Sequence, residues 1–262
     1  NSADLLGTSK RELDISSLKS IKEAAYTFKP SVVINAAACT NVDNCETDVD
    51  AAFAANALGP RNLALVCEEI KAKLIHVSTD YVFAGDSLIP YREHDLPHPV
   101  NVYGKTKYLG EEYIREFCRT YFIVRTSWLY GHKGKNFVKT IIKASGEKEF
   151  LEVVDDQKGS PTNAEDLAYH ILKIGLTDEY GIYHCSGRGI CSWYDFARKI
   201  IEFSNSKCSV VPVKSERIKR PARRPAYSFL DNMMLRCTVG DGMRHWEDAL
   251  KDYMRNTNQN EI

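Results

Sequence analysis

Three residues stand at spacings that suit chemistry at a carbonyl group. Thr79 follows the apolar run 74–78, whose continuous hydrophobicity is typical of a buried parallel strand. Its hydroxyl is therefore expected at the carboxyl end of that strand, where open α/β sheets bind their ligands. Tyr103 and Lys107 stand four residues apart in a helical pattern, so their side chains face the same way.

A hydroxyl, a phenol and an amine around one carbonyl are the groups needed to interconvert a ketone and an alcohol with a nicotinamide. A phenol titrates near 10, and an ammonium one helical turn away favours its phenolate. We therefore expect Lys107 to lower the pKa of Tyr103 towards neutral pH. Tyr-x-x-x-Lys also occurs by chance in many helices, but here it follows a strand that ends Ser-Thr-Asp at residues 78–80, which makes it more specific.

In this order the two segments resemble the extended short-chain dehydrogenase/reductase family. Residues 76–85 (HVSTDYVFAG) and 125–131 (RTSWLYG) are similar in particular to its dTDP-4-dehydrorhamnose reductases, and the resemblance covers almost the whole chain. It implies reduction of the C4 ketone of dTDP-4-dehydro-L-rhamnose by NADPH or NADH. The product would be dTDP-L-rhamnose, a precursor of surface polysaccharide.

The resemblance also implies roles for individual residues. Tyr103 would give its proton to the developing alkoxide, Lys107 would hold the nicotinamide ribose, and Thr79 would bind the carbonyl oxygen. Asp80 and Trp128 would orient the sugar.

The fold implied is a Rossmann-type doubly wound parallel sheet with a smaller C-terminal substrate-binding lobe. We expect residues 1–131 to form the dinucleotide-binding domain and 132–262 mainly the lobe, with a helix at 163–176 packing back on the sheet. A Rossmann domain starts with a strand and a glycine-rich turn, and neither stands at the start of this sequence. Residues 4–9 instead have the pattern of the second strand. Either the natural protein has roughly 25–30 more residues upstream, or it lacks a phosphate loop and binds dinucleotides poorly.

The residues after this second strand bear on the choice of cofactor. An acid here would bind the ribose hydroxyls of NAD, and a base would accommodate the 2′-phosphate of NADP. Ser9, Lys10 and Arg11 include two cations and no acid, which favours NADPH over NADH; a solvated basic turn is the alternative. The further cofactor contacts implied by the resemblance are Asp14, Ile15, Ala36, Ala37, Ala38, Asn56, Tyr103 and Lys107.

Periodicity predicts the elements that position these residues. Ser16 is the expected N-cap of a helix that ends before Pro30. Residues 31–38 have the pattern of a buried strand. Residues 48–70 have that of a long helical stretch, in which Pro60 predicts a kink or a break.

Downstream, a loop and a strand complete the predicted edge of the sheet. The loop 87–101 contains His94 and His98, which we expect to lie in solvent rather than to act in catalysis. The strand 121–126 would deliver Trp128 to the same edge as Thr79.

A basic segment at 217–224 is the one local excess of charge. It suits the diphosphate of a nucleotide sugar; a solvated loop is the alternative, and nucleic acid is disfavoured because no stacking aromatics accompany it. Arg224 belongs to a segment, Arg-Pro-Ala-Tyr-Ser, that resembles the family's pattern and indicates substrate binding.

Composition sets further limits. Lys plus Arg and Asp plus Glu both number 35, so no bulk field attracts nucleic acid or a membrane. The eight cysteines form no Cys-x-x-Cys, and the seven histidines show no ligand spacing, so we expect reduced thiols, no metal and a cytoplasmic protein. Whether the chain forms a homodimer is left open.

Two rival functions remain. A nucleotide-sugar dehydratase or epimerase shares the tyrosine and lysine, but the dehydratases have a glutamate after the aspartate, where this chain has Tyr81. A non-catalytic regulatory subunit of the methionine adenosyltransferase type shares the fold, and tight binding to a second protein would indicate it.

Overall fold

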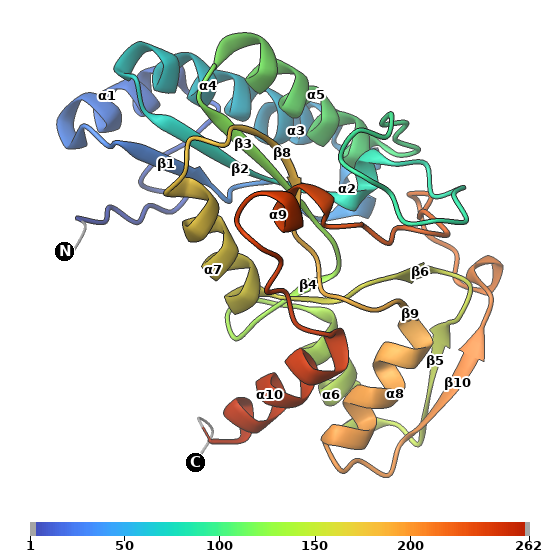
Figure 1. Cartoon of the computed structure of the whole chain (residues 1–262). Coiled ribbons are helices and arrows are strands. Elements are labelled where there is room, and N and C mark those ends of the chain that lie inside the picture. The colour runs from blue at the N-terminus through green and yellow to red at the C-terminus, as the bar shows by residue number, and fades with distance from the viewer. Residues whose placement is uncertain (1–3, 260–262) are drawn as a thin grey trace.

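A four-stranded parallel sheet forms the centre of the molecule in a computed structural model that describes residues 4–259. Its strand order is β1-β2-β3-β8 (Figure 1). The strands are β1 (Val32–Asn35), β2 (Lys73–Thr79), β3 (Tyr121–Thr126) and β8 (Gly181–His184). The predicted α/β class with a parallel sheet is confirmed.

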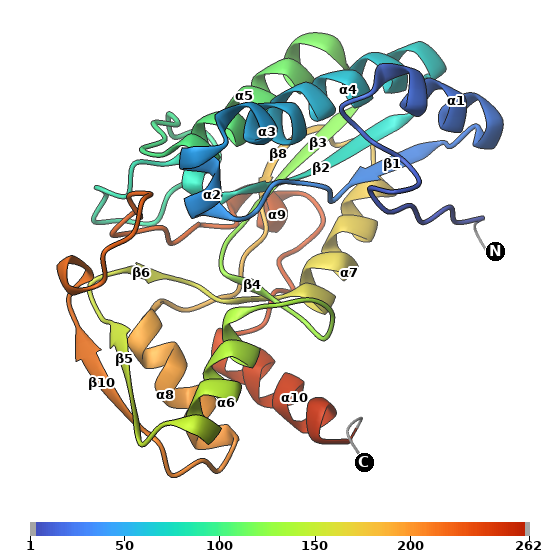
Figure 2. The ribbon, with the colours of Figure 1, turned by 180° about the vertical axis from the view of Figure 1, so that it is seen from behind.

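Helices cover both faces of the sheet, because successive side chains of each strand point to opposite faces. One face carries α1 (Leu18–Phe28), α4 (Gly59–Ile70) and α5 (Val102–Phe117), and the other α7 (Ala164–Gly175) and α9 (Met233–Cys237) (Figures 1 and 2). The core under the first set includes Ile21, Leu63, Leu74, Ile114 and Ile123. The core under the second includes Ile75, Phe122, Val124, Leu167 and Leu235.

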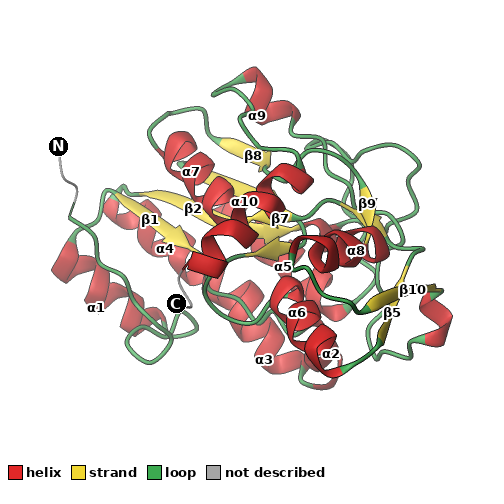
Figure 3. Ribbon diagram, turned by 90° about the horizontal axis from the view of Figure 1, so that it is seen from below, coloured by secondary structure: helices red, strands yellow, loops and turns green. Residues whose placement is uncertain are grey.

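A second lobe has a hydrophobic core of its own, formed by residues from 130 onwards. In Figure 3, α8 (Trp193–Phe203) lies beside the parallel strand pair β5 (Phe150–Val154) and β10 (Ser209–Val213). The helix α8 begins with a reciprocal cap between Ser192 and Asp195. The elements of the lobe are α6 (Phe137–Glu147), β5 (Phe150–Val154), α8 (Trp193–Phe203), β10 (Ser209–Val213) and α10 (Trp246–Gln259). Two short pairings, β4 (Leu129–Tyr130) with β7 (Thr162–Asn163) and β6 (Lys158–Gly159) with β9 (Cys191–Ser192), lie in the same part of the chain.

The helical stretch before α4 is divided, as Pro60 predicted. The helices α2 (Val42–Thr47) and α3 (Val49–Phe53) precede one π-helical turn, Ala54–Leu58, and α4 follows at Gly59. Pro60 has no N–H to continue the i→i−4 ladder. The π turn itself was not predicted, and it carries the buried side chain of Asn56.

Three local predictions are wrong. Residues 4–9 form no strand, since among residues 4–259 no strand lies beside them, and Leu5 is 90% exposed. The strand β1 stops at Asn35, and as an edge strand it leaves Ile34 43% exposed instead of buried. The cap of α1 is Ser17, whose Oγ accepts from the N–H of Ser20, rather than Ser16.

The two histidines of the loop 87–101 are exposed, as expected. No helix within residues 4–259 is both long and apolar enough to span a membrane.

Candidate active site

Thr79 and Tyr103 meet at the carboxyl end of β2. Thr79 is the last residue of β2, and its hydroxyl is hydrogen-bonded to that of Tyr103 in the first turn of α5. Asn101 caps α5 by accepting from the N–H of Gly104 at 2.8 Å. A Cβ on Gly104 would lie 2.2 Å from the carbonyl oxygen of Tyr81. Only glycine therefore lets the helix start this close to the end of the strand.

The titration of Tyr103 differs from the expectation. Burial raises the pKa of Tyr103 above its usual range, and the hydrogen bond with Thr79 acts in the opposite direction. The predicted lowering by Lys107 is wrong for this structure, because the lysine amine is engaged elsewhere. A phenol with a raised pKa keeps its proton at neutral pH and is a weaker acid than expected, but it can still protonate an alkoxide, which is a stronger base than a phenolate.

Lys107 stands one helical turn after Tyr103 on α5 and is 2% exposed. Its Nζ donates to the carbonyl oxygen of Val77 at 2.7 Å and lies 3.1 Å from Nε2 of His76. Burial lowers the pKa of Lys107 to about 8, and the nearby carboxylate of Glu111 opposes that shift. The amine can therefore change its charge close to neutral pH.

A buried ion pair lies behind the lysine. Glu111, one helical turn after Lys107, accepts from Nη2 of Arg125 at 2.6 Å, from its Nε at 3.1 Å, and from the hydroxyl of Ser78 at 2.5 Å. Both partners are almost fully buried. This pair was not predicted from the sequence, although Glu111 stands on the helix face of Lys107 and that position was a usable signal.

Asp80 and Arg224 are two charged residues that each have one buried atom without a partner among the described residues. Desolvation raises the pKa of Asp80 to about 6, while hydrogen bonds from Ser228 and Thr79 oppose the shift. Its Oδ2 has no partner among the described residues. Arg224 donates from Nη2 to Asp43 at 2.9 Å, yet its Nη1 is buried without a partner in the described chain. Buried polar atoms are nearly always paired, so both atoms are candidates for contact with a ligand.

The rest of the basic segment serves other contacts. Arg217 pairs with Glu152 on β5. The side chains of Lys219, Arg220 and Arg223 are exposed. Arg224 is thus the member of this segment that the fold directs inward, with its guanidinium 5.9 Å from the ring of Tyr81.

Trp128 has a strained backbone and a close aromatic neighbour. Its φ is 47°, in the left-handed region that non-glycine residues rarely adopt and that is enriched at functional sites. Its indole stacks on Trp193 of α8 with ring centroids 3.7 Å apart and planes 10° apart. A Cβ on Gly159 would lie 2.8 Å from the Trp128 ring, so this glycine allows β6 to pass beside it.

The candidate cofactor residues fall into two groups. Ser9 donates to the carboxylate of Glu12 at 2.7 and 2.8 Å, so an acid does stand in the turn with Lys10, three residues after Ser9. Asp14 accepts from the N–H and hydroxyl of Ser16. Ile15 packs against Gly59 at the start of α4.

The second group lies nearer to the catalytic pair. Asn56 accepts from the N–H of Cys39 at 2.8 Å, and its Nδ2 donates to the carbonyl oxygen of Cys39 at 3.1 Å and to the hydroxyl of Thr106 at 3.2 Å. It thereby ties the segment after Ala36, Ala37 and Ala38 to α5.

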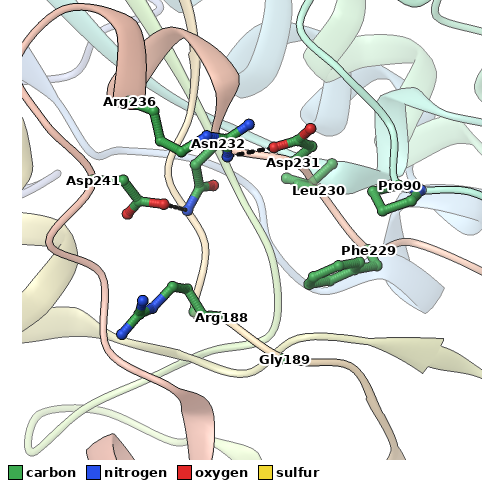
Figure 4. Close-up of a pocket in the computed structure, with 10 residues that line it drawn as sticks. Pro90, Arg188, Gly189, Phe229, Leu230, Asp231, Asn232, Arg236 and Asp241 are labelled. Carbon is green, nitrogen blue, oxygen red and sulfur yellow. Dashed lines mark hydrogen bonds and ion pairs between the residues drawn. The ribbon is translucent and has the colours of Figure 1, made fainter.

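A surface hollow of about 670 Å³ lies elsewhere, lined by residues of the β8–β9 connection and of the segment that enters α9. Figure 4 shows Arg188 and Arg236 on its walls together with Asp231 and Asp241. None of the predicted site residues lines it. Its charges are of both signs, so we place the chemistry at Thr79 and Tyr103 rather than in this hollow. Within residues 4–259 no cluster of three or more histidine, cysteine or acidic side chains could hold a metal ion.

Comparison with known proteins gives extensive matches. Residues 1–259 match the family described as RmlD substrate binding domain. Spore coat polysaccharide biosynthesis protein SpsK of Bacillus subtilis is 41% identical over 252 residues, covering 96% of this chain and 88% of the relative.

Solved structures agree with this. The dTDP-4-dehydrorhamnose reductase of Clostridium acetobutylicum superposes with a TM-score of 0.94 at 43% identity, covering 96% of this chain and 89% of that one. The enzyme of the same name from Bacillus anthracis, solved in complex with NADP, has a TM-score of 0.93 at 43% identity, covering 95% and 89% of the two chains.

Proposed function

Since this chain belongs to the RmlD substrate binding domain family, a family of dTDP-4-dehydrorhamnose reductase-like oxidoreductases, we propose that it reduces the C4 ketone of a dTDP-4-keto-6-deoxy sugar. The substrate we favour is dTDP-4-dehydro-L-rhamnose, and the product is dTDP-L-rhamnose for surface polysaccharide. The observation that carries the proposal is the hydrogen-bonded pair Thr79 and Tyr103 at the carboxyl edge of the sheet, together with the buried Lys107 one helical turn after Tyr103.

Each catalytic residue has a task that follows from its position. Thr79 holds the carbonyl oxygen through its hydroxyl and stabilises the charge that develops there. Tyr103, protonated at neutral pH, gives its proton to that oxygen. Lys107 binds the ribose of the nicotinamide and, when its amine is protonated, supplies positive charge. The unpaired Oδ2 of Asp80 accepts from a sugar hydroxyl, and the face of Trp128 orients the ring.

The cofactor we propose is NADPH, with NADH as the weaker alternative. When bound, it supplies the hydride for the ketone carbon. Ala36, Ala37 and Ala38 fit a flat dinucleotide, since their methyl groups leave the main chain after β1 open. Lys10 is exposed near Ser9 and would meet the 2′-phosphate, although Glu12 in the same turn weakens this attraction. A lower Michaelis constant for NADH than for NADPH would contradict the choice.

We propose Arg224 as the diphosphate contact, and residues 132–262 as the lobe that supplies most of the substrate surface. The free Nη1 of Arg224 suits a phosphate oxygen, for which guanidinium donors have the right geometry.

The relative SpsK suggests a second candidate substrate. The 41% identity to SpsK, whose name gives no substrate, leaves a different 4-keto-6-deoxy sugar as the second candidate. Membership of the family favours an enzyme over a non-catalytic subunit, and Tyr81 after Asp80 still distinguishes the chain from dehydratases.

The test is turnover of NADPH with the dTDP-4-keto-6-deoxy sugar, followed by the loss of nicotinamide absorbance. Tyr103→Phe should lower kcat by about a hundredfold or more, since it removes the acid, and should leave NADPH binding intact. Tyr113→Phe, on the same helix but away from the site, is the matched control. Cofactor binding without turnover in the wild type would refute the proposed reaction.

A further inference from the structure

A chain of buried polar groups runs from the main chain after β1 to the amine of Lys107. Asn35 and His76 are directly paired across β1 and β2. Asn35 Nδ2 lies 2.9 Å from His76 Nδ1, and His76 Nε2 lies 3.1 Å from Lys107 Nζ. The three side chains are at most 3% exposed. The roles proposed above for the site use neither Asn35 nor His76.

The N–H of Ala37 fixes the direction of every proton in this chain. It donates to Asn35 Oδ1 at 3.1 Å, so the amide of Asn35 must present its NH₂ to His76. Nδ1 of His76 then accepts, and the proton of the neutral imidazole stands on Nε2. Burial holds the pKa of His76 well below its usual value, so the ring is neutral and carries this single proton.

A protonated Nε2 faces Lys107 as a donor. The uncharged amine of Lys107 can accept that hydrogen bond. An ammonium cannot, because its N–H groups and the Nε2–H of His76 are both donors. Charging Lys107 therefore requires the other imidazole tautomer and a turned amide at Asn35, which would forfeit the bond from Ala37. The protonation of Lys107 is thus coupled to the main chain of the segment 36–38.

We infer that Asn35 and His76 are positioning residues that fix the place of the Lys107 amine and oppose its protonation. The charged and titratable groups around Lys107 are Tyr103 and Glu111 on α5, His76 on β2, and Arg125 on β3, which is bonded to Glu111. Because Arg125 is bonded to Glu111 and offsets part of its charge, the imidazole is the neighbour whose hydrogen bond depends directly on the charge of the amine. In its kinetic consequences the inference rests on the function proposed above.

Two near-isosteric variants separate the two contacts of the imidazole. In His76→Gln the amide reaches the position of Nε2, so the Lys107 contact is kept. In His76→Asn the amide reaches the position of Nδ1, so the Asn35 contact is kept and Lys107 is released. Both variants place a neutral amide in the same buried site. Equal melting temperatures of the two variants would show that they lose the same amount of packing.

The first readout is binding of NADPH, titrated by nicotinamide fluorescence, which needs no substrate. His76→Asn should weaken binding by about tenfold or more, the scale of one buried hydrogen bond lost, and His76→Gln should stay within about threefold of the wild type. Equal weakening in variants of equal stability would overturn the inference, since His76 would then only fill space. This readout remains decisive even if the wild type does not reduce the proposed sugar.

The second readout is the alkaline limit of kcat/KM, which reports ionisation in the free enzyme. His76→Asn should move this limit to higher pH, because the donor that favours the uncharged amine is gone. Asn35→Asp should move it in the same direction, since a carboxylate accepts a hydrogen bond from Nδ1, which shifts the imidazole proton from Nε2 to Nδ1 and leaves Nε2 as an acceptor for the ammonium. An unchanged limit in both variants, in an enzyme that turns over, would refute control of Lys107 protonation.

Discussion

Replacing Asp80 by asparagine should stabilise the folded protein at neutral pH while abolishing its function. Asp80 is 2% exposed, and its Oδ2 has no partner in the described part of the chain. Its Oδ1 accepts from Thr79 at 3.0 Å. Asparagine keeps the shape and this acceptor but carries no charge, so the substitution isolates the effect of the buried carboxylate.

The size and sign of the effect follow from the pKa. Desolvation raises the pKa of Asp80 from 3.8 to about 6, so the folded protein binds this proton more tightly than the unfolded chain does. Above pH 6 the ionised carboxylate opposes folding by about 3 kcal/mol, since one pKa unit corresponds to about 1.4 kcal/mol. The penalty fades as the pH falls from 6 towards 3.8 and is about 1 kcal/mol at pH 4.5.

The assay is urea unfolding of the wild type and Asp80→Asn at pH 7.5 and pH 4.5. The variant should gain up to about 3 kcal/mol in the free energy of unfolding at pH 7.5 and about 2 kcal/mol less at pH 4.5. Asp50→Asn, an exposed change in α3, should alter stability by less than about 1 kcal/mol at both pH values. A loss of stability at pH 7.5, or a gain that does not depend on pH, would refute the reasoning.

Three further substitutions test other parts of the structure. Glu111→Gln removes the charge that faces Arg125 and leaves a buried guanidinium uncompensated. It should therefore lower the free energy of unfolding, measured in urea, by about 3–5 kcal/mol. A loss below about 1 kcal/mol would contradict this. Ser192→Ala should destabilise the protein by about 1 kcal/mol by removing the cap of α8, and an unchanged urea midpoint would argue against it. Arg224→Ala should raise the KM for the nucleotide sugar roughly tenfold, with the exposed Arg223→Ala as control; equal KM values in the two would remove Arg224 from the site.

The strands and helices that hold the site were predictable because their signals are local. The continuous apolar runs of β2 and β3 and the four-residue spacing of Tyr103 and Lys107 depend on neighbouring residues alone. The residues 4–9 show the opposite case. Their pattern is that of a strand, but a strand exists only when another strand pairs with it, and pairing is not encoded in six residues.

The pKa values of the site could not be predicted from the sequence either, because they too depend on contacts between distant parts of the chain. Proximity along α5 suggested that Lys107 acts on Tyr103, but burial dominates the pKa of both groups. Burial depends on the whole fold. The sequence places His76 inside an apolar strand. A titratable residue at such a position indicates a buried polar contact. Its partner Asn35 lies 41 positions earlier, which only the register of β1 against β2 reveals.

The π turn at Ala54–Leu58 bears on which changes of chain length the protein tolerates. This turn contains one residue more than an α-helical turn would, and it leads into α4 at Gly59. A Cβ on Gly110 would lie 2.2 Å from the carbonyl oxygen of Asn56, so α5 packs tightly against this point. Deleting one residue would restore a regular helix but rotate Asn56 by about 100° relative to α4, away from Cys39 and Thr106. The protein should therefore tolerate many substitutions along this helical stretch but not the deletion of a residue from it.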